Sequence, residues 1–374
     1  MIRAFIIFII FSFNLFPLQA HKVNVKEDGT NHLDIVFCLD LSGSTNGLIS
    51  DVREGLWHIV NQIHLLQPQP DFRIGVVGFS RPSFKKENAY VKVLCPLTTN
   101  FDLLSHELYK IRPAIEKGDQ YVGVALNTCI KKMNWNEGKE ARKIIYIAGN
   151  GWVGTNNNDF LKACRLALER NIVINTVYVM GKSDKARELP EWYKIAALTK
   201  GIPTVISIGR KDLPFNKQMD FKAIFEASLI FNETYIYHGL NGFKQYHLLL
   251  EADSAAFAAG HNAFAERVYY KNSSIFKWEN QEWELVDYMI KNGTLPTAMD
   301  TLTIPDSLRE KPPEEIYNMV YDQKINRQQV ISKLDMLFKE DFPLKVHQQY
   351  ASGELKEENS FARSVIILLL KEWN

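Results

Sequence analysis

Three oxygen-bearing side chains, those of Asp40, Ser42 and Ser44, stand at alternate positions just after an apolar run at residues 33–39. A run with helical spacing follows them at residues 49–65. In an open α/β fold, a turn after a strand lies at the carboxyl end of the sheet, where ligands bind. Carboxylate and hydroxyl oxygens are the ligands that hard divalent cations prefer. The spacing therefore predicts a binding site that uses Mg²⁺, or Mn²⁺ or Ca²⁺.

A metal-free alternative uses the same three residues. Asp and Ser are also common in turns and at helix N-caps. In that case Asp40 caps the helix or bonds to loop amides, while Ser42 and Ser44 satisfy backbone groups. The triplet alone does not separate these two interpretations.

Patterns typical of strands and helices alternate between residues 30 and 210. Continuous apolar runs indicate parallel strands buried on both faces, and one alternating run suits an edge strand. The strand-like runs are 33–39, 73–79, 90–94, 143–148, 172–179 and 204–208, and the helical runs are 49–65, 101–111, 122–133, 159–170 and 192–199. This order predicts an α/β fold with a doubly wound, mostly parallel, Rossmann-like sheet.

The pattern changes after about residue 215, where strand-like runs disappear apart from residues 234–237. Helical patterns remain at 246–270, 283–290, 325–338 and 361–373. A glycine-containing segment at 238–242 is typical of a hinge. We therefore expect an α/β domain over residues 30–235 and a mainly helical C-terminal region over 236–374.

The first 20 residues predict export. Arg3 precedes an apolar stretch at residues 4–13, and residues 17–20 have the character of a cleavage region, which is the order of a signal peptide. An uncleaved anchor is the alternative, but Asn14 and Pro17 interrupt the stretch, and a span needs about 20 apolar residues. No later run approaches that length. The expected product is periplasmic, cell-surface or secreted, with no stable membrane span after cleavage.

The composition is that of a globular protein, with 46% hydrophobic and 23% charged residues. The net charge is +1, and Arg3 is the only charged residue of the first 20, so the remaining chain is neutral. A neutral chain without a basic run lacks the electrostatic footprint of a nucleic-acid partner.

The four cysteines, Cys38, Cys95, Cys129 and Cys164, are widely spaced within apolar patterns. Export permits disulfides, and four cysteines allow three complete pairings. Their apolar surroundings favour buried free thiols instead.

No local motif for catalysis is present. The chain has no Gly-x-Ser-x-Gly elbow, no P-loop, no His-Glu-x-x-His and no dinucleotide-binding glycine fingerprint. We therefore predict a protein that is not an enzyme. A hydrolase with its site between the two halves is an alternative, which Asp119 converging with Asp253 or Glu266 would favour.

A strand followed by Asp-x-Ser-x-Ser, within this α/β order, resembles a von Willebrand factor type A (VWA) domain. That family builds a metal-ion-dependent adhesion site from three loops at the top of its sheet. The resemblance implies that Ser42 and Ser44 bind the cation directly and that Asp40 acts largely through water. It also implies that an acidic group of a protein or surface ligand completes the metal shell.

The other two loops depart from the family pattern. The family's second loop offers a Thr, whereas here Gln120 takes that position and Asp119 precedes it. The third loop usually offers an Asp, whereas here Asn150 stands in its place. The resemblance therefore implies a variant site of Asp40, Ser42, Ser44, Asp119, Gln120 and Asn150, in which Asp119 restores the missing charge if it turns inward.

More narrowly, the chain resembles a group of exported bacterial proteins that carry such a domain. The shared runs are 47–49, Trp57, 118–121, 149–150, 269–272 and 283–287. The implied function is an exported binding or adhesion module, and the alternative is a metal-free structural or assembly protein of the cell envelope.

Two further expectations concern single side chains. Trp152 follows the third loop, so we expect an exposed aromatic ring beside the site. The charged residues Glu251, Asp253, Glu266 and Arg267 fall in the helical pattern at 246–270 and are expected on a solvated helix face.

Overall fold

The computed structural model describes residues 31–112, 121–153, 160–181, 186–207, 219–297, 299–338, 342–355 and 360–373. The predicted signal peptide lies outside these residues. Residues 31–374 form one compact unit. Within the described part, no helix combines the length and apolar character needed to cross a membrane.

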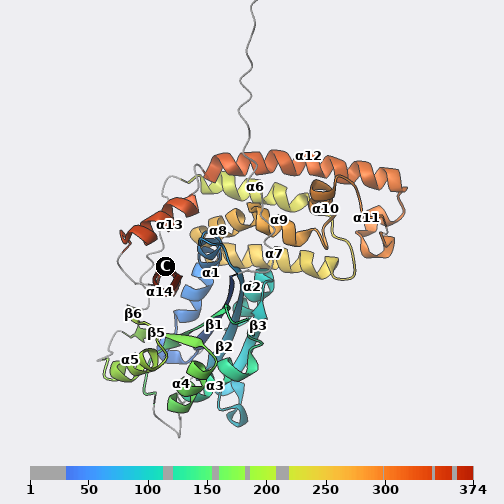
Figure 1. The fold of residues 1–374 in the computed structure, drawn as a ribbon. Helices are drawn as coiled ribbons and strands as arrows, with labels where there is room; N and C mark the ends of the chain where they lie inside the picture. Colours follow the sequence, from blue (N-terminus) through green and yellow to red (C-terminus); the bar gives the residue numbers. More distant parts are fainter. Residues whose placement is uncertain are drawn as a thin grey trace, which may run out of the picture. The chain divides into compact units, whose positions relative to one another are not determined.

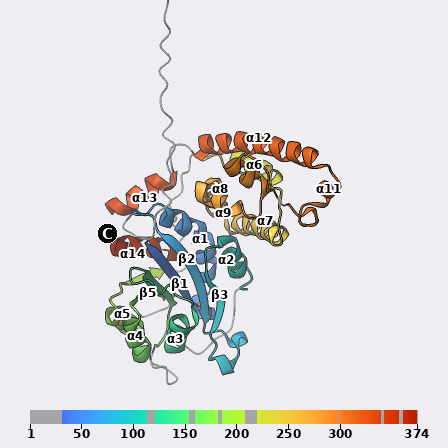
Figure 2. The same ribbon diagram turned by 45° about the vertical axis from the view of Figure 1, so that its right-hand side comes forward.

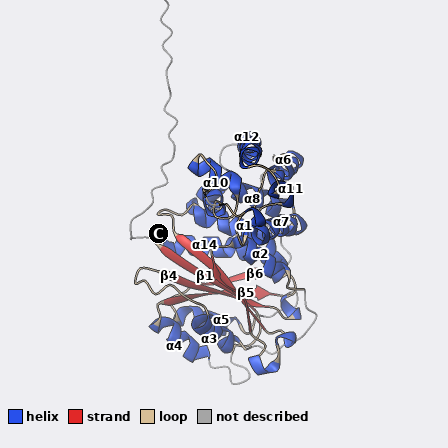
Figure 3. Cartoon of the chain, turned by 90° about the vertical axis from the view of Figure 1, so that its right-hand side faces the viewer, coloured by secondary structure: helices blue, strands red, loops and turns tan. Residues whose placement is uncertain are grey.

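A six-stranded sheet forms the centre of the α/β part (Figure 3). Its strands are β1 (His32–Asp40), β2 (Asp71–Phe79), β3 (Lys92–Thr98), β4 (Arg142–Gly149), β5 (Ile172–Met180) and β6 (Pro203–Ser207). The order is β3-β2-β1-β4-β5-β6, and all neighbours are parallel except β2 and β3. The prediction of a doubly wound, mostly parallel sheet is confirmed, and the edge strand β3 is antiparallel.

Helices cover both faces of the sheet because β1 buries residues on both sides. Leu33, Ile35, Phe37 and Leu39 belong to one core, whereas Val36 and Cys38 belong to the other. The first core also contains α1 (Leu48–His64), α2 (Phe101–Tyr109) and α14 (Phe361–Trp373), and the second contains α3 (Val122–Lys132), α4 (Phe160–Glu169) and α5 (Leu189–Leu198). The four cysteines are free and buried, as expected, and burial raises the pKa of Cys95 and of Cys164 to about 12.

The helix α14 covers the sheet although about 150 residues separate it from β6. The Phe361 ring packs edge-on against Phe37 of β1, with centroids 5.0 Å apart. The Phe361 N–H donates to Asp51 of α1 at 2.6 Å, and the Asn175 amide of β5 donates to Glu372 at 2.5 Å. The helical segment between β6 and α14 is therefore inserted before a helix that completes the sheet's core.

The inserted helices pack over α1 and α2 (Figures 1 and 2). They are α6 (Phe221–Glu233), α7 (Gly242–Ala259), α8 (His261–Asn272), α9 (Ser274–Asn280), α10 (Leu285–Asn292), α11 (Asp306–Arg309), α12 (Pro313–Phe338) and α13 (Phe342–Ser352). The mainly helical C-terminal region is thus confirmed, and α8 contacts α1 while α7 contacts α2. The predicted boundary near residues 236–242 falls between α6 and α7.

The helical pattern at 246–270 is two helices and not one. Gly260 separates α7 from α8 with a φ of +138°. Only glycine adopts this φ without strain, so the chain turns sharply there. The period of the apolar residues continues across the turn, which is why the sequence pattern predicted one helix.

The expectation of solvated charges on this segment is wrong for three of its four residues. Asp253, Glu266 and Arg267 are buried, with 6%, 5% and 0% of their surface exposed. Arg267 binds Asp253 at 2.9 Å and Asp102 of α2 at 2.6 Å, and its guanidinium lies 4.3 Å from the ring centre of Trp57. Buried charges need such partners because an unpaired ion in the interior is strongly destabilising.

A second buried carboxylate joins α8 to α1. Glu266 lies 2.7 Å from the Nδ1 of His58, and its Oε2 accepts a hydrogen bond from Asn61 at 2.6 Å. The other ring nitrogen of His58 lies 3.1 Å from the hydroxyl of Tyr350 in α13. The Arg267 network therefore fastens α7 and α8 to α2 and to the Trp57 ring of α1, and the Glu266 network fastens α8 and α13 to α1.

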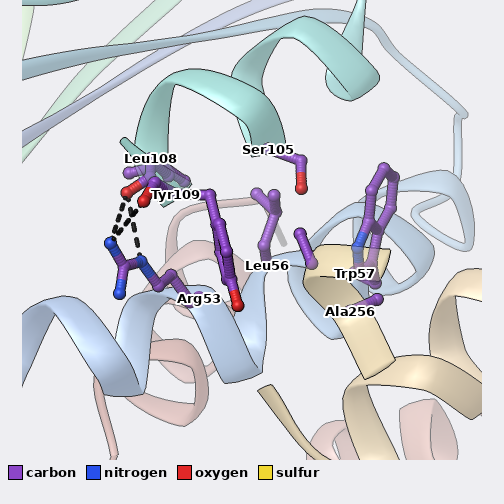
Figure 4. Close-up of a pocket in the computed structure, with 8 residues that line it drawn as sticks. Arg53, Leu56, Trp57, Ser105, Leu108, Tyr109 and Ala256 are labelled. Atoms are coloured by element: carbon purple, nitrogen blue, oxygen red, sulfur yellow. Dashed lines mark hydrogen bonds between the residues drawn. The ribbon is translucent and has the colours of Figure 1, made fainter. Parts of the chain in front are cut away.

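Arg53 of α1 holds the end of α2 (Figure 4). Its guanidinium donates to the carbonyls of Leu108 at 2.9 Å and Tyr109 at 3.0 Å, and also to that of Ile111. The last carbonyls of a helix lack partners within the helix, so this arginine satisfies them. The gap beside it has a volume of about 10 Å³, which is the size of a single water and too small for a ligand.

Candidate functional site

The first loop lies at the carboxyl end of β1 and brings the predicted oxygens together. The backbone N–H of Ser42 donates to Oδ1 of Asp40 at 2.9 Å. The hydroxyl oxygens of Ser42 and Ser44 are 2.9 Å apart. The two serine hydroxyls therefore lie side by side, and the Asp40 carboxylate is held by the backbone of the same loop.

Thr45, which the sequence analysis does not single out, and Gly47, which belongs to the shared run 47–49, shape this loop. The hydroxyl of Thr45 donates to the carbonyls of Asp40 at 2.8 Å and Ser42 at 3.1 Å, which closes the turn. Gly47 precedes α1 with a φ of +127°, a conformation that favours glycine. The Thr-Asn-Gly order that follows Ser44 is a sequence signal for both features.

The third loop follows β4 and contributes Asn150. Its Oδ1 accepts a hydrogen bond from the hydroxyl of Ser44 at 3.0 Å. Its Nδ2 donates to the carbonyl of Val179 in β5 at 3.2 Å. The carbonyl acceptor fixes which way the amide points, so the oxygen of Asn150 faces the first loop.

Gly149 lets β4 approach Asp40 closely. A Cβ on Gly149 would lie 2.7 Å from the Cβ of Asp40 and 3.1 Å from the ring of Trp192. Trp192 donates its indole N–H to the carbonyl of Gly151 at 2.9 Å, and Glu191 accepts from the N–H of Val153 at 2.8 Å. The third loop is therefore held from α5, far away in the sequence.

The residues of the site range from fully buried to solvent-exposed. Asp40 is fully buried, and Ser42 and Asn150 have 4% and 8% of their surface exposed, whereas Ser44 lies at the surface. Trp152, two residues after Asn150, is 48% exposed, as predicted. Asp40 therefore lies at the bottom of the site, and Ser44 and Trp152 lie at its solvent-exposed edge.

The second loop lies outside the described residues. Asp119 and Gln120 fall in the segment 113–120, so their predicted roles stay predictions. Within the described part of the chain, no three His, Cys, Asp or Glu side chains gather as metal ligands. The oxygens described above come instead from one carboxylate, two hydroxyls and one amide.

The site lies where the winding of the sheet reverses. The chain leaves β1 through α1 on one face toward β2, and it leaves β4 through α4 on the other face toward β5. Adjacent loops that diverge in this way leave a crevice between β1 and β4, where open α/β sheets bind ligands. Fold and site together define a doubly wound α/β domain with oxygen ligands at its switch point.

The family comparison identifies this domain. Residues 34–200 match the von Willebrand factor type A domain, so this part of the chain is a VWA domain. A mainly helical region follows it. The VWA domain is a module often used for adhesion and protein interaction. Among curated proteins, none matches this chain.

Several solved structures are similar over about half of the chain. The VWA domain of SpRpn10 is 13% identical, with a TM-score of 0.36, over 48% of this chain and 89% of that one. Proximal thread matrix protein 1 from the mussel byssus is 16% identical, with a TM-score of 0.35, over 48% and 42% of the two chains. The pilus adhesin SpaC from Lactobacillus rhamnosus GG is 13% identical, with a TM-score of 0.36, over 46% and 28%. The chain thus spans less than half the length of the mussel protein and of the pilus adhesin.

Proposed function

We propose that this protein is an exported binding module and not an enzyme. Its VWA domain engages an acidic group of a partner protein or surface ligand through a divalent cation, with Mg²⁺ as the first candidate. The observation that carries the proposal is the meeting of the Ser42, Ser44 and Asn150 side-chain oxygens at the switch point of the sheet, in the loop that also holds the Asp40 carboxylate. Export rests on the N-terminal sequence alone.

The donor set fits a small hard cation. Mg²⁺ takes six oxygens at about 2.0–2.1 Å, so neighbouring ligand oxygens lie about 2.9 Å apart. The Ser42 and Ser44 hydroxyl oxygens are separated by 2.9 Å, and the Ser44 hydroxyl and the Asn150 carbonyl oxygen by 3.0 Å. These three oxygens and the Asp40 carboxylate would hold the cation, and the cation would supply an attachment point for a partner's carboxylate.

The protein's own residues keep the donors in place. The Ser42 N–H orients the Asp40 carboxylate, and the Val179 carbonyl orients the Asn150 amide. Such positioning from backbone groups is the supporting shell that metal sites need. The exposed Trp152 would add apolar contact area for a partner at the edge of the site.

The metal-free alternative has its own support. The same distances suit hydrogen bonds, and the Ser42, Ser44 and Asn150 side chains already form a chain of them. In that case the loops are held without a cation, and the protein is a structural or assembly component of the cell envelope.

Calorimetric titration and thermal unfolding of residues 21–374 with Mg²⁺ and Mn²⁺ separate the two. A dissociation constant near 0.1 mM would stabilise the protein by about 2.7 kcal/mol at 10 mM metal. The variant Asp40→Ala is expected to lose the heat and the stabilisation. The matched control is Asp71→Asn, which changes an exposed carboxylate at the opposite end of β2. An absence of heat and of any thermal shift at 10 mM metal would reject the metal site.

Partner capture is tested separately. Cell-envelope extract is passed over the immobilised protein with and without a chelator. Proteins that bind wild type but neither the chelated protein nor Asp40→Ala would support the proposed function. Capture that ignores both changes would favour the structural alternative.

A further inference from the structure

A cavity of about 390 Å³ lies apart from the candidate metal site, between α2 and the inserted helices. Its walls come from the start of α2, from α7 and α8, and from α9 with the turn that follows it, elements that Figure 1 shows next to one another. This volume lies within the range of small-molecule sites. It is large enough for one long side chain of a partner.

The lining of the cavity is acidic. Asp102, Glu279 and Glu282 line it, and none of its described lining residues is Lys, Arg or His. Arg267 neutralises Asp102 from behind. Glu279 and Glu282 lie on the exposed, open side of the cavity. Burial raises the pKa of Glu279 to about 7, and a cation bound beside it would favour its charged form.

A buried amide supplies an independent observation. Asn280 lines the cavity and has 4% of its surface exposed. Its Nδ2 has no hydrogen-bond partner among the described residues. A buried donor without a partner is destabilising, so this group calls for a ligand oxygen that accepts a hydrogen bond.

Aromatic rings form the remaining wall. Tyr270 and Phe276 line the cavity, and on their inner side they already hold a cation, because the guanidinium of Arg267 lies 5.8 Å and 5.3 Å from their ring centres. Trp278 at the rim is 50% exposed and holds the ammonium of Lys291 at 3.3 Å from its ring centre. Rings of this kind attract cations through their negative faces.

We propose that this cavity binds the alkylammonium or guanidinium group of a basic residue in a polypeptide partner. Glu279 and Glu282 attract the cationic head, and the aromatic wall contacts its aliphatic stem. Asn280 donates to an amide carbonyl of the same residue. The site is independent of the VWA metal site, because it shares no residue with it.

The test uses matched ligands on the full chain from residue 21. N-acetyl-lysine methylamide and N-acetyl-arginine methylamide are titrated and followed by calorimetry and by NMR line shifts. N-acetyl-norleucine methylamide is the control ligand, because it keeps the stem and the carbonyls and lacks the charge. We expect millimolar binding of both cationic ligands and binding about tenfold weaker for norleucine, since hydrogen bonds that involve a charged group are the stronger ones. Equal binding of norleucine and lysine overturns the proposal.

Variants locate the binding. The pair Glu279→Gln and Glu282→Gln is expected to weaken lysine binding about tenfold. Glu314→Gln, an exposed carboxylate of α12, is the control and leaves it unchanged. Lys291→Met is expected to strengthen binding, because it removes a like charge from the Trp278 ring. Unchanged affinity in the Glu279→Gln and Glu282→Gln pair overturns the proposal.

Two further experiments identify the kind of ligand and separate this cavity from the metal site. A Lys-containing tripeptide binding more tightly than the single residue supports a protein partner, and a free alkylamine binding better than either overturns that assignment. A chelator and Asp40→Ala leave lysine binding unchanged, so this test and the test of the metal site fail or succeed separately.

Discussion

Gly55 of α1 faces Ala362 of α14 so closely that a Cβ on Gly55 would lie 2.3 Å from the Cβ of Ala362. Real Cβ atoms do not approach to this distance, and both partners are short, rigid groups on helix backbones. The absence of a side chain at Gly55 therefore sets how near α14 lies to α1. This contact joins the helix after β1 to a helix 300 residues further along the chain.

Gly55→Ala is expected to lower the free energy of unfolding by about 1–3 kcal/mol, the usual cost of overpacking. Ala normally stabilises a helix by about 1 kcal/mol relative to Gly. A loss of stability in this variant would therefore come from the clash between the new Cβ and Ala362. Chemical denaturation measures it, with Ser50→Ala on the exposed face of α1 as the control. In a double-mutant cycle, Ala362→Gly should relieve most of the effect of Gly55→Ala. Additive losses would show that the two positions do not meet.

Asn150→Asp is expected to act in opposite directions with and without metal. The new carboxylate loses the bond from Nδ2 to Val179 and places an oxygen against the Val179 carbonyl, so the protein should be less stable in chelator. Mg²⁺ should then stabilise the variant more than wild type, with affinity about tenfold higher, because a carboxylate is a stronger ligand than an amide. Thermal unfolding with EDTA and with 10 mM Mg²⁺ checks both parts. A variant that unfolds like wild type under both conditions would contradict the geometry of the third loop.

Arg327→Met is expected to cost about 3–5 kcal/mol of stability, because it leaves buried carboxylates without their counter-ion. Arg327 of α12 binds Glu284 at 2.7 Å and Asp287 at 2.8 Å, and all three side chains are buried. Urea denaturation measures the loss, with Lys333→Met at an exposed position of α12 as the control. If both variants lose the same small amount, the network is not a stabilising contact.

Asp51 predicts a pH dependence of stability. Burial raises the pKa of the Asp51 carboxyl to about 6, although the hydrogen bond from the N–H of Phe361 lowers this pKa in part. A carboxyl with a raised folded-state pKa contributes stability below its ordinary pKa near 4 and loses that contribution as the pH rises through about 6. The melting temperature of Asp51→Asn should therefore fall less than that of wild type between pH 4 and pH 7. Asp322→Asn, at an exposed position, should follow wild type, and parallel profiles of all three proteins would contradict the role of Asp51.

The α/β half was predictable because its strands carry their own signal. The strands β1, β4 and β5 are buried on both faces, so each forms a continuous apolar run. The first loop was predictable for a related reason, because Asp40, Ser42 and Ser44 come from one short segment. The pairing of Ser44 with Asn150 was expected only through the VWA resemblance, since 106 residues separate them.

The buried charges were not predictable from local pattern. Arg267 looks like a residue of a solvated helix face, and the partner that explains its burial, Asp102, lies 165 residues away. Glu284 is a similar case, because its side chain caps α10 and binds Arg327 at the same time. The runs at 269–272 and 283–287, which resemble those of similar proteins, contain Lys271 and Glu284, and the ion pairs of these residues hold the inserted helices together.

The packing of α14 against the sheet determines when the core of the N-terminal half can be completed during folding. Phe37 and Tyr146, on one side of the sheet, lack the packing of Phe361 and its neighbours until residues 361–373 have been synthesised. A growing chain therefore cannot finish its N-terminal half first, as successive independent domains do. Residues 34–200 produced alone would expose this apolar side to water and would be prone to aggregate, so the recombinant unit to work with is the one that includes α14.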